Sequence, residues 1–333
     1  MAQPLLAKLK QRHPDAIIDV IASSWVAPVI QRMPEVHSVM DSPLKHGKLN
    51  WTGIVHTAEQ LKEAGYDEAI ILPNSFKSAL ITFKAGIPVR RGFLGEMRYL
   101  LINKIVQPDP KKSIRLIDRY LMIADKKTLP QAANNTFCPP YLQSSTDDQR
   151  RVLSSFSLDQ HKPIITLCPG AEYGPAKRWP AHHFAKLIDL LSSVDCQICL
   201  LGSQKDFVIA EEILTQASTK KLQCFNLCGK TSLNQAIDLL AASSVAVVHD
   251  SGLMHVACAS NIPVVAIYGS SSPSYTPPVS PIASIVQNSQ PCSPCFSRTC
   301  RFGHYNCLES VLPEQIFQNL QDMCLITPHI AKN

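Results

Sequence analysis

The stretch PIITLCPGAEYGPAKRWPAHHFAKLIDLLSS, residues 163–193, contains the pattern that decides the fold of this chain. Residues 163–168 form an apolar, β-branched run typical of a buried strand. Residues 179–193 repeat apolar side chains at helical spacing, with a proline in the first turn. The loop between them carries two glycines and a Lys-Arg pair. Strand, glycine loop, cation and helix in this order indicate a segment that holds phosphate at a helix N-terminus.

The same alternation continues on both sides of this stretch. In the second half we predict strands at 163–168, 196–202, 224–229, 245–249 and 263–269, and helices at 179–193, 206–214, 232–243 (capped by Ser232) and just after 252. The first half is less regular, with predicted strands at 16–22, 68–73 and 88–93 and helices near 53–64, 75–84 and 113–124. Residues 127–162, rich in Pro, Gln, Asn, Ser and Asp, are predicted to cross between domains. We therefore expect an α/β chain of two Rossmann-like domains, 1–150 and 151–333, facing across a cleft, with ligands at the carboxyl ends of the strands.

Composition narrows the class of protein. At 333 residues and 45% hydrophobic composition, the chain is long enough for two packed domains. It has no run of about 18 apolar residues, and charges interrupt its first 25 residues, so we expect a cytoplasmic protein without a signal peptide or transmembrane segment. Among its twelve cysteines, Cys168, Cys199 and Cys258 lie in apolar runs and are expected to be buried hydrophobic side chains.

Positive charge gathers in the first half of the chain. Residues 77–119 carry ten Lys and Arg against three Asp and Glu, a local charge of +7. Such a segment indicates an anionic partner. Aromatic side chains suited to stacking on bases are few there, so nucleic acid is not the expected partner.

Two loops of the second half suit a diphosphate. The chain has no G-x-G-x-x-G after a strand and no G-x-x-x-x-G-K-[ST], which disfavours dehydrogenases and P-loop kinases. Gly170 permits close approach of a ligand to the backbone, and Lys177 supplies a cation before a helix. An ordinary Pro-Gly turn with exposed basic residues would give the same sequence pattern. In HDSGLMHVA (249–257), the N–H groups of Ser251 and Gly252 are placed to bind phosphate, unless Asp250 serves only as a helix N-cap.

Several blocks of the sequence resemble one protein family, and they occur in the same order along the chain. They are IIDVIASSW, ILPNSFKSAL, AGIPVRRGFLGEMRYLLIN, PGAEYGPAKRWP, LLGSQKD, LCGKTSL, DSGLMHVA and YGSSSPSYTPP. Together they resemble the bacterial ADP-heptose:lipopolysaccharide heptosyltransferases, in particular the heptosyltransferase II group. The resemblance implies the GT-B architecture and inverting transfer of heptose from ADP-heptose to the heptosyl-Kdo-lipid A inner core. It also implies no cofactor for the chemistry and a peripheral location at the inner face of the inner membrane.

The resemblance also assigns roles to individual residues. Lys177 would stabilise the departing ADP, and Ser251 and Gly252 would cradle its phosphates. The full donor set that it implies is Gly170, Lys177, Asp206, Asp250, Ser251, Gly252 and His255, with Asp206 toward the ribose. The acceptor set in the basic first domain is Asn74, Ser75, Lys77, Arg91 and Arg98.

The start of the chain looks like the second half of a helix that runs into a strand. The family's domain begins earlier, with a strand and a glycine loop that carries the aspartate acting as general base, and residues 1–15 contain no match to it. We therefore expect a heptosyltransferase shortened at its N-terminus. Its first domain would lack its first strand, and its transfer activity would be weak or absent.

A cysteine-rich segment near the C-terminus leaves two readings open. The spacing C-x2-C-x4-C-x6-C of Cys292, Cys295, Cys300 and Cys307 suits a structural zinc ion, although free thiols in a reducing cytosol fit as well.

Two other functions also stay open for the whole chain. One is a sugar-nucleotide epimerase, which would need no basic acceptor face, and the other is a non-catalytic nucleotide-sugar binder.

Overall fold

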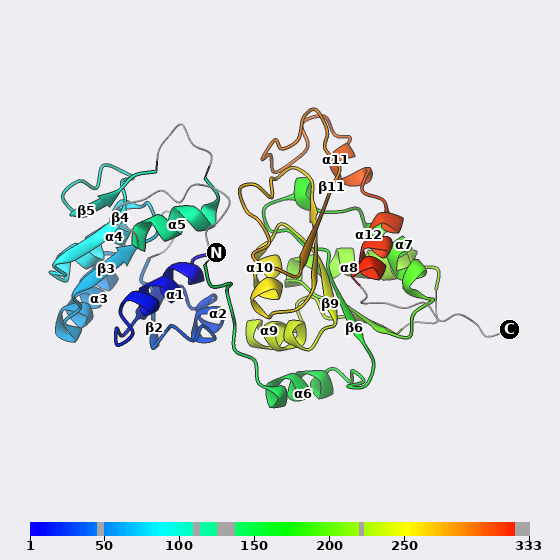
Figure 1. Ribbon diagram of the computed structural model, residues 1–333, viewed down its shortest axis with the longest axis horizontal. Coiled ribbons are helices and arrows are strands. Elements are labelled where there is room, and N and C mark those ends of the chain that lie inside the picture. The colour runs from blue at the N-terminus through cyan, green and yellow to red at the C-terminus, as the bar shows by residue number, and fades with distance from the viewer. Residues whose placement is uncertain (45–49, 109–113, 125–136, 220–222, 324–333) are drawn as a thin grey trace. The chain divides into compact units, whose positions relative to one another are not determined.

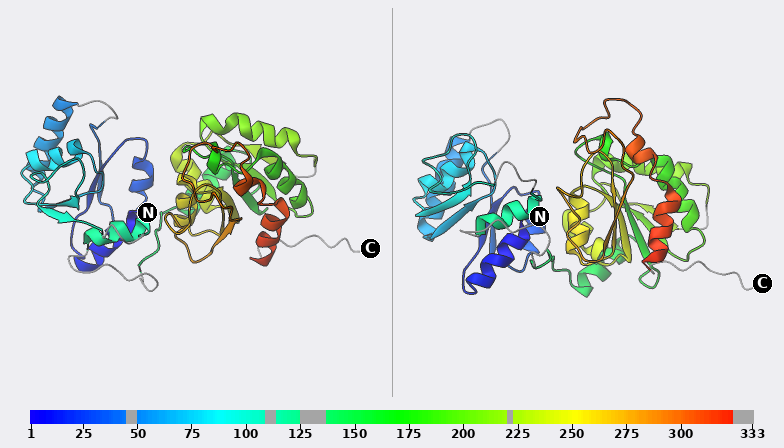
Figure 2. Two further views of the ribbon diagram at one scale, coloured as in Figure 1. Left: turned by 90° about the horizontal axis from the view of Figure 1, so that it is seen from above. Right: turned by 45° about the horizontal axis from the view of Figure 1, so that its top comes forward.

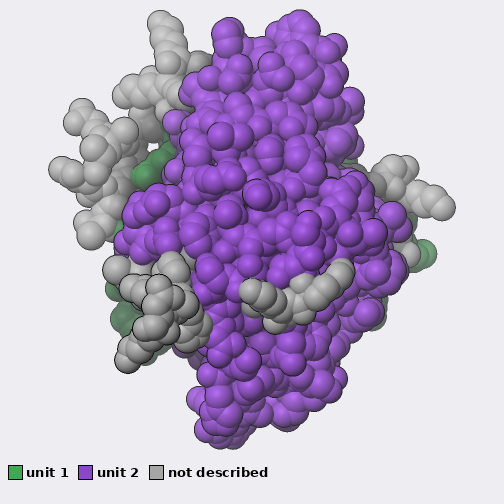
Figure 3. All heavy atoms as spheres, turned by 90° about the vertical axis from the view of Figure 1, so that its right-hand side faces the viewer, with its two compact units in different colours: residues 1–138 green, residues 139–333 purple. Residues whose placement is uncertain are grey.

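The structure is a computed structural model, and it describes all residues except 45–49, 109–113, 125–136, 220–222 and 324–333 (Figure 1). The chain divides into two compact units, Met1–Cys138 and Pro139–Asn333, coloured separately in Figure 3. Within the described residues, no helix is long and apolar enough to cross a bilayer.

The division lies earlier than the expected boundary at residue 150. Residue 150 falls inside a helix of unit 2, α6 (Thr146–Ser155), which packs against α9 (Leu233–Ala241). The polar composition that suggested a linker belongs to the capped first turn of α6, where the Ser145 hydroxyl accepts a hydrogen bond from the Asp148 N–H. Residues 127–136 of the predicted crossing lie outside the described part of the chain.

Unit 2 is built on one parallel sheet of six strands in the order β11-β10-β9-β6-β7-β8. Helices α9 and α10 cover one face, and α7, α8 and α12 cover the other (Figures 1 and 2). The chain order reverses between β6 and β9, which pair directly, with Leu167 opposite Val247. The strands are β6 (Ile164–Cys168), β7 (Gln197–Leu200), β8 (Gln223–Asn226), β9 (Val245–His249), β10 (Val264–Tyr268) and β11 (Ala283–Gln287). The helices are α7 (Ala181–Leu191), α8 (Phe207–Gln216), α10 (Gly252–Ala259), α11 (Asn306–Glu309) and α12 (Pro313–Asp322).

The predicted strands and helices of unit 2 are confirmed, whereas strand β11 and helices α11 and α12 were not predicted. Strands β6, β7, β9 and β10 are buried along their whole length, which explains why they appear in the sequence as continuous apolar runs. Cys168 and Cys199 in these strands are fully buried, and Cys258 in α10 is 3% exposed, as expected. Ser232 caps α9 by accepting a hydrogen bond from the Gln235 N–H.

Unit 1 also consists of parallel strands, but they form two separate sheets. One sheet pairs β1 (Asp19–Ala22) with β2 (Ser38–Asp41), and the other has the order β3-β4-β5. The strands of the second sheet are β3 (Glu68–Ile71), β4 (Val89–Phe93) and β5 (Lys104–Val106). The helices are α1 (Gln3–Arg12), α2 (Ala27–Gln31), α3 (Trp51–Ala64), α4 (Phe76–Lys84) and α5 (Leu116–Ala124). The predicted α/β fold with parallel sheets is thus present in both units.

Candidate functional site

The centre of the candidate site is a buried ion pair at the carboxyl edge of the unit 2 sheet. Lys177 follows β6 and Asp250 follows β9, so both lie at the point where the strand order reverses, the usual position of ligands in such sheets. The Lys177 ammonium lies 2.6 Å from Oδ2 of Asp250, and the two side chains are 16% and 5% exposed. Thr276 donates a hydrogen bond of 3.1 Å to the same oxygen. The pair therefore holds a cation at a fixed place beside the sheet edge.

Helix α10 begins next to this pair, and its first turn is open. Its N-cap, Ser251, is extended and makes no side-chain cap hydrogen bond, and a Cβ added at Gly252 would meet nothing within 4 Å. Four polar atoms nearby in the chain are buried without a partner in the described structure: Oγ of Ser251, Ser270 and Ser271, and Nδ1 of His255. Buried polar atoms are nearly always hydrogen-bonded, so these four atoms are able to bind a polar group. A helix N-terminus suits an anion because its first N–H groups have no partner within the helix.

Two histidines of this region, the buried His249 and the half-buried His255, have lowered pKa values. Burial lowers the pKa of His249 and that of His255 from 6.5 to about 4. His249 Nε2 accepts a hydrogen bond of 2.8 Å from the Trp179 N–H, so the proton resides on Nδ1, which faces the carbonyl oxygen of Gly170 at 3.4 Å. The His249 ring therefore joins the two ends of the loop that carries Lys177.

Residues 296–298 of the cysteine-rich segment hold the middle of the loop that carries Lys177. Tyr173 donates a 2.6 Å hydrogen bond to the carbonyl of Phe296, and the Ala176 N–H donates to the carbonyl of Arg298. Gly174 has φ +151°, and a Cβ there would lie 2.4 Å from the Arg298 oxygen. The Lys177 ammonium lies 4.9 Å from the centre of the Tyr173 ring. The cysteine-rich segment thus directly supports the loop that positions Lys177.

Sequence reasoning missed these supporting residues, namely His249, Tyr173, Thr276 and Arg298. The sequence offers one signal for His249, because it ends an otherwise apolar buried strand, where an imidazole needs partners. The contact between residues 173–176 and 296–298 joins segments more than 100 residues apart and leaves no local signal.

The structure gives Gly170 and Asp206 a role in loop packing. Oδ2 of Asp206 accepts hydrogen bonds from the N–H and hydroxyl of Ser203, at 2.8 and 2.7 Å, and so caps the turn before α8. A Cβ at Gly170 would lie 2.3 Å from this carboxylate. The missing side chain of Gly170 therefore makes room for Asp206, which is 7% exposed.

On the acceptor side, the five expected residues divide into two groups. Asn74 is exposed and Ser75 and Lys77 are half-buried, all near the start of α4 at the carboxyl end of β3. Arg91 is 9% exposed, and its Nε lies 2.6 Å from Oε1 of Glu68.

Arg98 is fully buried, contrary to what an exposed anchor for the acceptor requires. It donates hydrogen bonds to the carbonyls of Pro73, Ser75 and Phe93 at 2.6 to 2.9 Å. The basic segment contains internal cations that its sequence does not distinguish from surface ones. Lys111 and Lys112 of that segment lie outside the described residues.

The four cysteines of the C-terminal segment are reduced and half-buried. Backbone N–H groups, first that of Tyr305 and then those of residues 302–304, lower the pKa of the Cys300 thiol. Burial and the other three thiols raise the pKa of Cys307. In the described residues, however, only His182, His183 and Glu309 bring three ligand atoms within 4.8 Å of one another, so the four sulfurs do not form a closed metal site in this arrangement.

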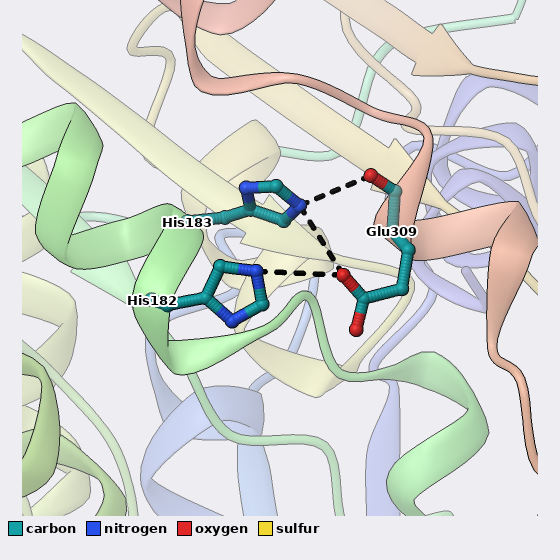
Figure 4. Close-up of side chains that lie close together, drawn as sticks. All are labelled: His182, His183 and Glu309. Carbon is teal, nitrogen blue, oxygen red and sulfur yellow. Dashed lines mark hydrogen bonds and ion pairs between the residues drawn. The ribbon is translucent and has the colours of Figure 1, made fainter.

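The His182, His183 and Glu309 cluster connects α7 to α11 (Figure 4). Nε2 of His182 and Nε2 of His183 lie 3.4 and 3.5 Å from Oε2 of Glu309. Nε2 of His183 is also 3.0 Å from the Glu309 backbone oxygen. A carbonyl only accepts, so this nitrogen carries a proton and is not available as a metal ligand. We interpret the cluster as a hydrogen-bonded link that fixes the end of the cysteine-rich segment.

Comparison with known proteins identifies the family. Residues 54–306 match the model of glycosyltransferase family 9 (heptosyltransferase). Lipopolysaccharide heptosyltransferase 2 of Escherichia coli K12 is 41% identical over 329 residues, which cover 98% of this chain and 94% of that protein. Lipooligosaccharide heptosyltransferase 2 of Haemophilus ducreyi is 43% identical over 295 residues, covering 86% and 84%.

A solved structure described as E. coli ADP-heptose LPS heptosyltransferase II has a TM-score of 0.86 to this chain at 39% identity, covering 97% of this chain and 94% of that one. The likeness confirms the expected GT-B fold class. These findings favour a glycosyltransferase over the epimerase and the non-catalytic binder. The chain therefore belongs to glycosyltransferase family 9, the heptosyltransferases.

Proposed function

We propose that this enzyme transfers L-glycero-D-manno-heptose, with inversion, from ADP-heptose to the heptosyl-Kdo-lipid A inner core of lipopolysaccharide. The names of its relatives support the substrates. The observation that carries the proposal is the shielded Lys177–Asp250 pair in the loops next to the start of α10, and the partnerless polar atoms of Ser251 and His255 support an anion there.

In the proposed donor complex, the diphosphate lies at the N-terminus of α10, against the N–H groups of Ser251 and Gly252. Lys177 neutralises the negative charge that grows on ADP as the glycosidic bond breaks. A preorganised cation acts most strongly at that stage because it needs no rearrangement when the charge appears. Asp250 keeps the ammonium in place, and the neutral His255 contributes a hydrogen bond. This chemistry uses the protein's own charges and requires no cofactor.

On the acceptor side, we propose that Asn74, Ser75 and Lys77 contact the inner-core sugars and their anionic groups. Arg91 and Arg98 would act indirectly, by holding the loops after β3 and β4. The acceptor is anchored in a membrane, so we place the enzyme at the cytoplasmic face of the inner membrane as a peripheral protein.

We also propose a structural zinc ion bound by Cys292, Cys295, Cys300 and Cys307. The N–H groups that favour the Cys300 thiolate support it. Thiolates around one zinc stand roughly 3.8 Å apart, so binding would draw the four sulfurs together. Metal analysis of protein purified without chelator tests this, and less than about one-tenth equivalent of zinc or iron would reject it.

The test of function is a transfer assay with the 333-residue chain. ADP-heptose and lipopolysaccharide truncated after the first heptose are incubated with the enzyme, and released ADP and the mass of the product are both measured. Transfer would release ADP and add the mass of one heptose to the acceptor in equal amounts, and the weak activity expected from the sequence of residues 1–15 would appear as small but equal amounts of both. ADP-heptose binding by calorimetry without any product would instead support a non-catalytic binder, and release of ADP without glycosylated acceptor would support hydrolysis.

A further inference from the structure

The loop after β4 exposes apolar side chains and buries a charged one. Met97 and Leu100 are each 85% exposed and Tyr99 is 60% exposed, whereas Arg98 between them is fully buried. Leu101 and Ile102, which follow, pack inside at 8% and 0%. Large apolar side chains are rarely clustered at such exposure in a soluble protein, and such clusters mark interaction sites.

The loop is held in this arrangement by specific contacts. Arg98 is hydrogen-bonded to the carbonyls of Pro73, Ser75 and Phe93, which fixes the loop to the ends of β3 and β4. Glu96 and Met97 have left-handed backbones, with φ of +45° and +54°, which non-glycine residues adopt at an energetic cost. Oε2 of Glu96 also accepts a hydrogen bond of 2.6 Å from the Phe76 N–H at the start of α4. The outward position of Met97 and Leu100 is therefore built into the loop.

Cations accompany the apolar tip. Nε of Arg90 donates a 2.8 Å hydrogen bond to the carbonyl of Leu101, and Lys104 is exposed at the start of β5. Of the ten Lys and Arg in residues 77–119, Arg91 and Arg98 are buried and Lys111 and Lys112 lie outside the described residues, so the charge beside the loop comes from Arg90 and Lys104, which flank it. Apolar side chains flanked by Lys and Arg are the combination that binds anionic lipid surfaces, the apolar groups entering the acyl boundary and the cations meeting the headgroups.

We propose that the loop 96–100 docks reversibly on an anionic lipid bilayer, with Met97 and Leu100 inserted into its surface. This inference deepens the proposed function by placing the enzyme where a lipid-anchored acceptor is found. The loop adjoins the proposed acceptor residues, because Glu96 accepts a hydrogen bond from the Phe76 N–H and a Cβ at Gly95 would lie 2.9 Å from Asn74, but Met97 and Leu100 themselves are not among the proposed donor or acceptor residues. A single short loop gives weak attachment, which suits an enzyme that must leave one acceptor for the next.

The experiment is co-sedimentation of the full chain with vesicles of phosphatidylethanolamine and phosphatidylglycerol, compared with pure phosphatidylcholine. We expect binding to the anionic vesicles that weakens in about 1 M salt, where the screening length falls to about 3 Å. The double variant Met97→Ser/Leu100→Ser should lower the partition coefficient at least about tenfold. Val208→Ser is the matched control, since Val208 is 75% exposed on α8 of unit 2, and it should bind like the wild type.

The result that would overturn the proposal is wild-type protein that stays in the supernatant, or a double variant that binds as well as wild type. Unchanged melting temperatures check that both variants fold. A second assay uses a water-soluble acceptor freed of its acyl chains. If the proposed transfer is correct, the double variant should match wild type there and fall behind only with acceptor embedded in vesicles. No transfer by either protein to the soluble acceptor would count against the proposed function, while the vesicle result would stand by itself.

Discussion

The Lys177 ammonium and the Asp250 carboxylate form a 2.6 Å ion pair in which both partners are largely shielded from water. A cation this shielded is destabilised when it loses its partner, so the pair fixes the position of the Lys177 ammonium beside the proposed diphosphate site.

Replacing Lys177 by alanine should therefore impair the chemical step. We expect kcat to fall by about 10²-fold or more, with a smaller change in the KM for ADP-heptose, because the cation acts on charge that develops as the bond breaks. Lys177→Arg should recover part of the loss. Steady-state kinetics decide, and an unchanged kcat with a raised donor KM would assign Lys177 to ground-state binding instead.

The close approach between Gly174 and Arg298 predicts a second sensitive position. Gly174→Ala would place a methyl group 2.4 Å from the Arg298 carbonyl, so the loop must move and Lys177 with it. We expect kcat/KM to drop about tenfold or more. Gly65→Ala is the matched control, because Gly65 also has a positive φ, +69°, yet has open space around it. It should lose about 1 kcal/mol of stability and keep its activity, and equal activity losses in the two variants would point to a general effect of strain.

His249 predicts a dependence of stability on pH. Its pKa is about 4 in the folded protein and 6.5 ordinarily, so between these values the unfolded chain binds a proton that the folded one does not. The free energy of unfolding should therefore fall as the pH drops from 6.5 toward 4, by about 3 kcal/mol from this group. Denaturant unfolding of His249→Gln should show a smaller fall over that window. The exposed His161 offers the control His161→Gln, which should keep the wild-type slope.

The buried Arg98 predicts a loss of stability from an apparently basic surface position. Arg98→Met leaves carbonyls of Pro73, Ser75 and Phe93 without their donor, so we expect unit 1 to lose about 2–4 kcal/mol. Lys77→Ala should leave the melting temperature nearly unchanged and raise the KM for the acceptor. Thermal melting and acceptor kinetics of the two variants distinguish a role in stability from a role in acceptor binding. An Arg98→Met variant with the melting temperature of the wild type would instead support a role of Arg98 in acceptor binding.

Some features of the fold and of the site were predictable from the sequence, and others were not. The strands of unit 2 were predictable because β6 and β9 are buried on both faces, which makes them uninterrupted apolar runs. The placement of Lys177 and Asp250 at one edge of the sheet was predictable because the ends of parallel strands meet there, but their ion pair was not predicted.

The side-chain environments were not predictable in the same way. Arg98 and Arg91 look identical to solvent-exposed arginines in the sequence, since burial of a guanidinium depends on carbonyls supplied by other loops. Gly170 looks like a ligand-binding glycine, but its neighbour is the carboxylate of Asp206, which comes from the next loop. Helix α6 was taken for a linker because its first turn is polar, while the face that packs on α9 contributes only a few apolar residues.

The fully buried thiols of Cys168 and Cys199 can report how often unit 2 opens. Burial raises the pKa of both, that of Cys199 to about 12, so neither reacts with an alkylating reagent while the sheet is closed. Modification of either sulfur therefore requires an opening of unit 2 that exposes it. The rate at which mass is gained at Cys168 or Cys199 thus measures how often the scaffold beneath Lys177 comes apart, and ligands that bind the closed form should slow it without any label being introduced.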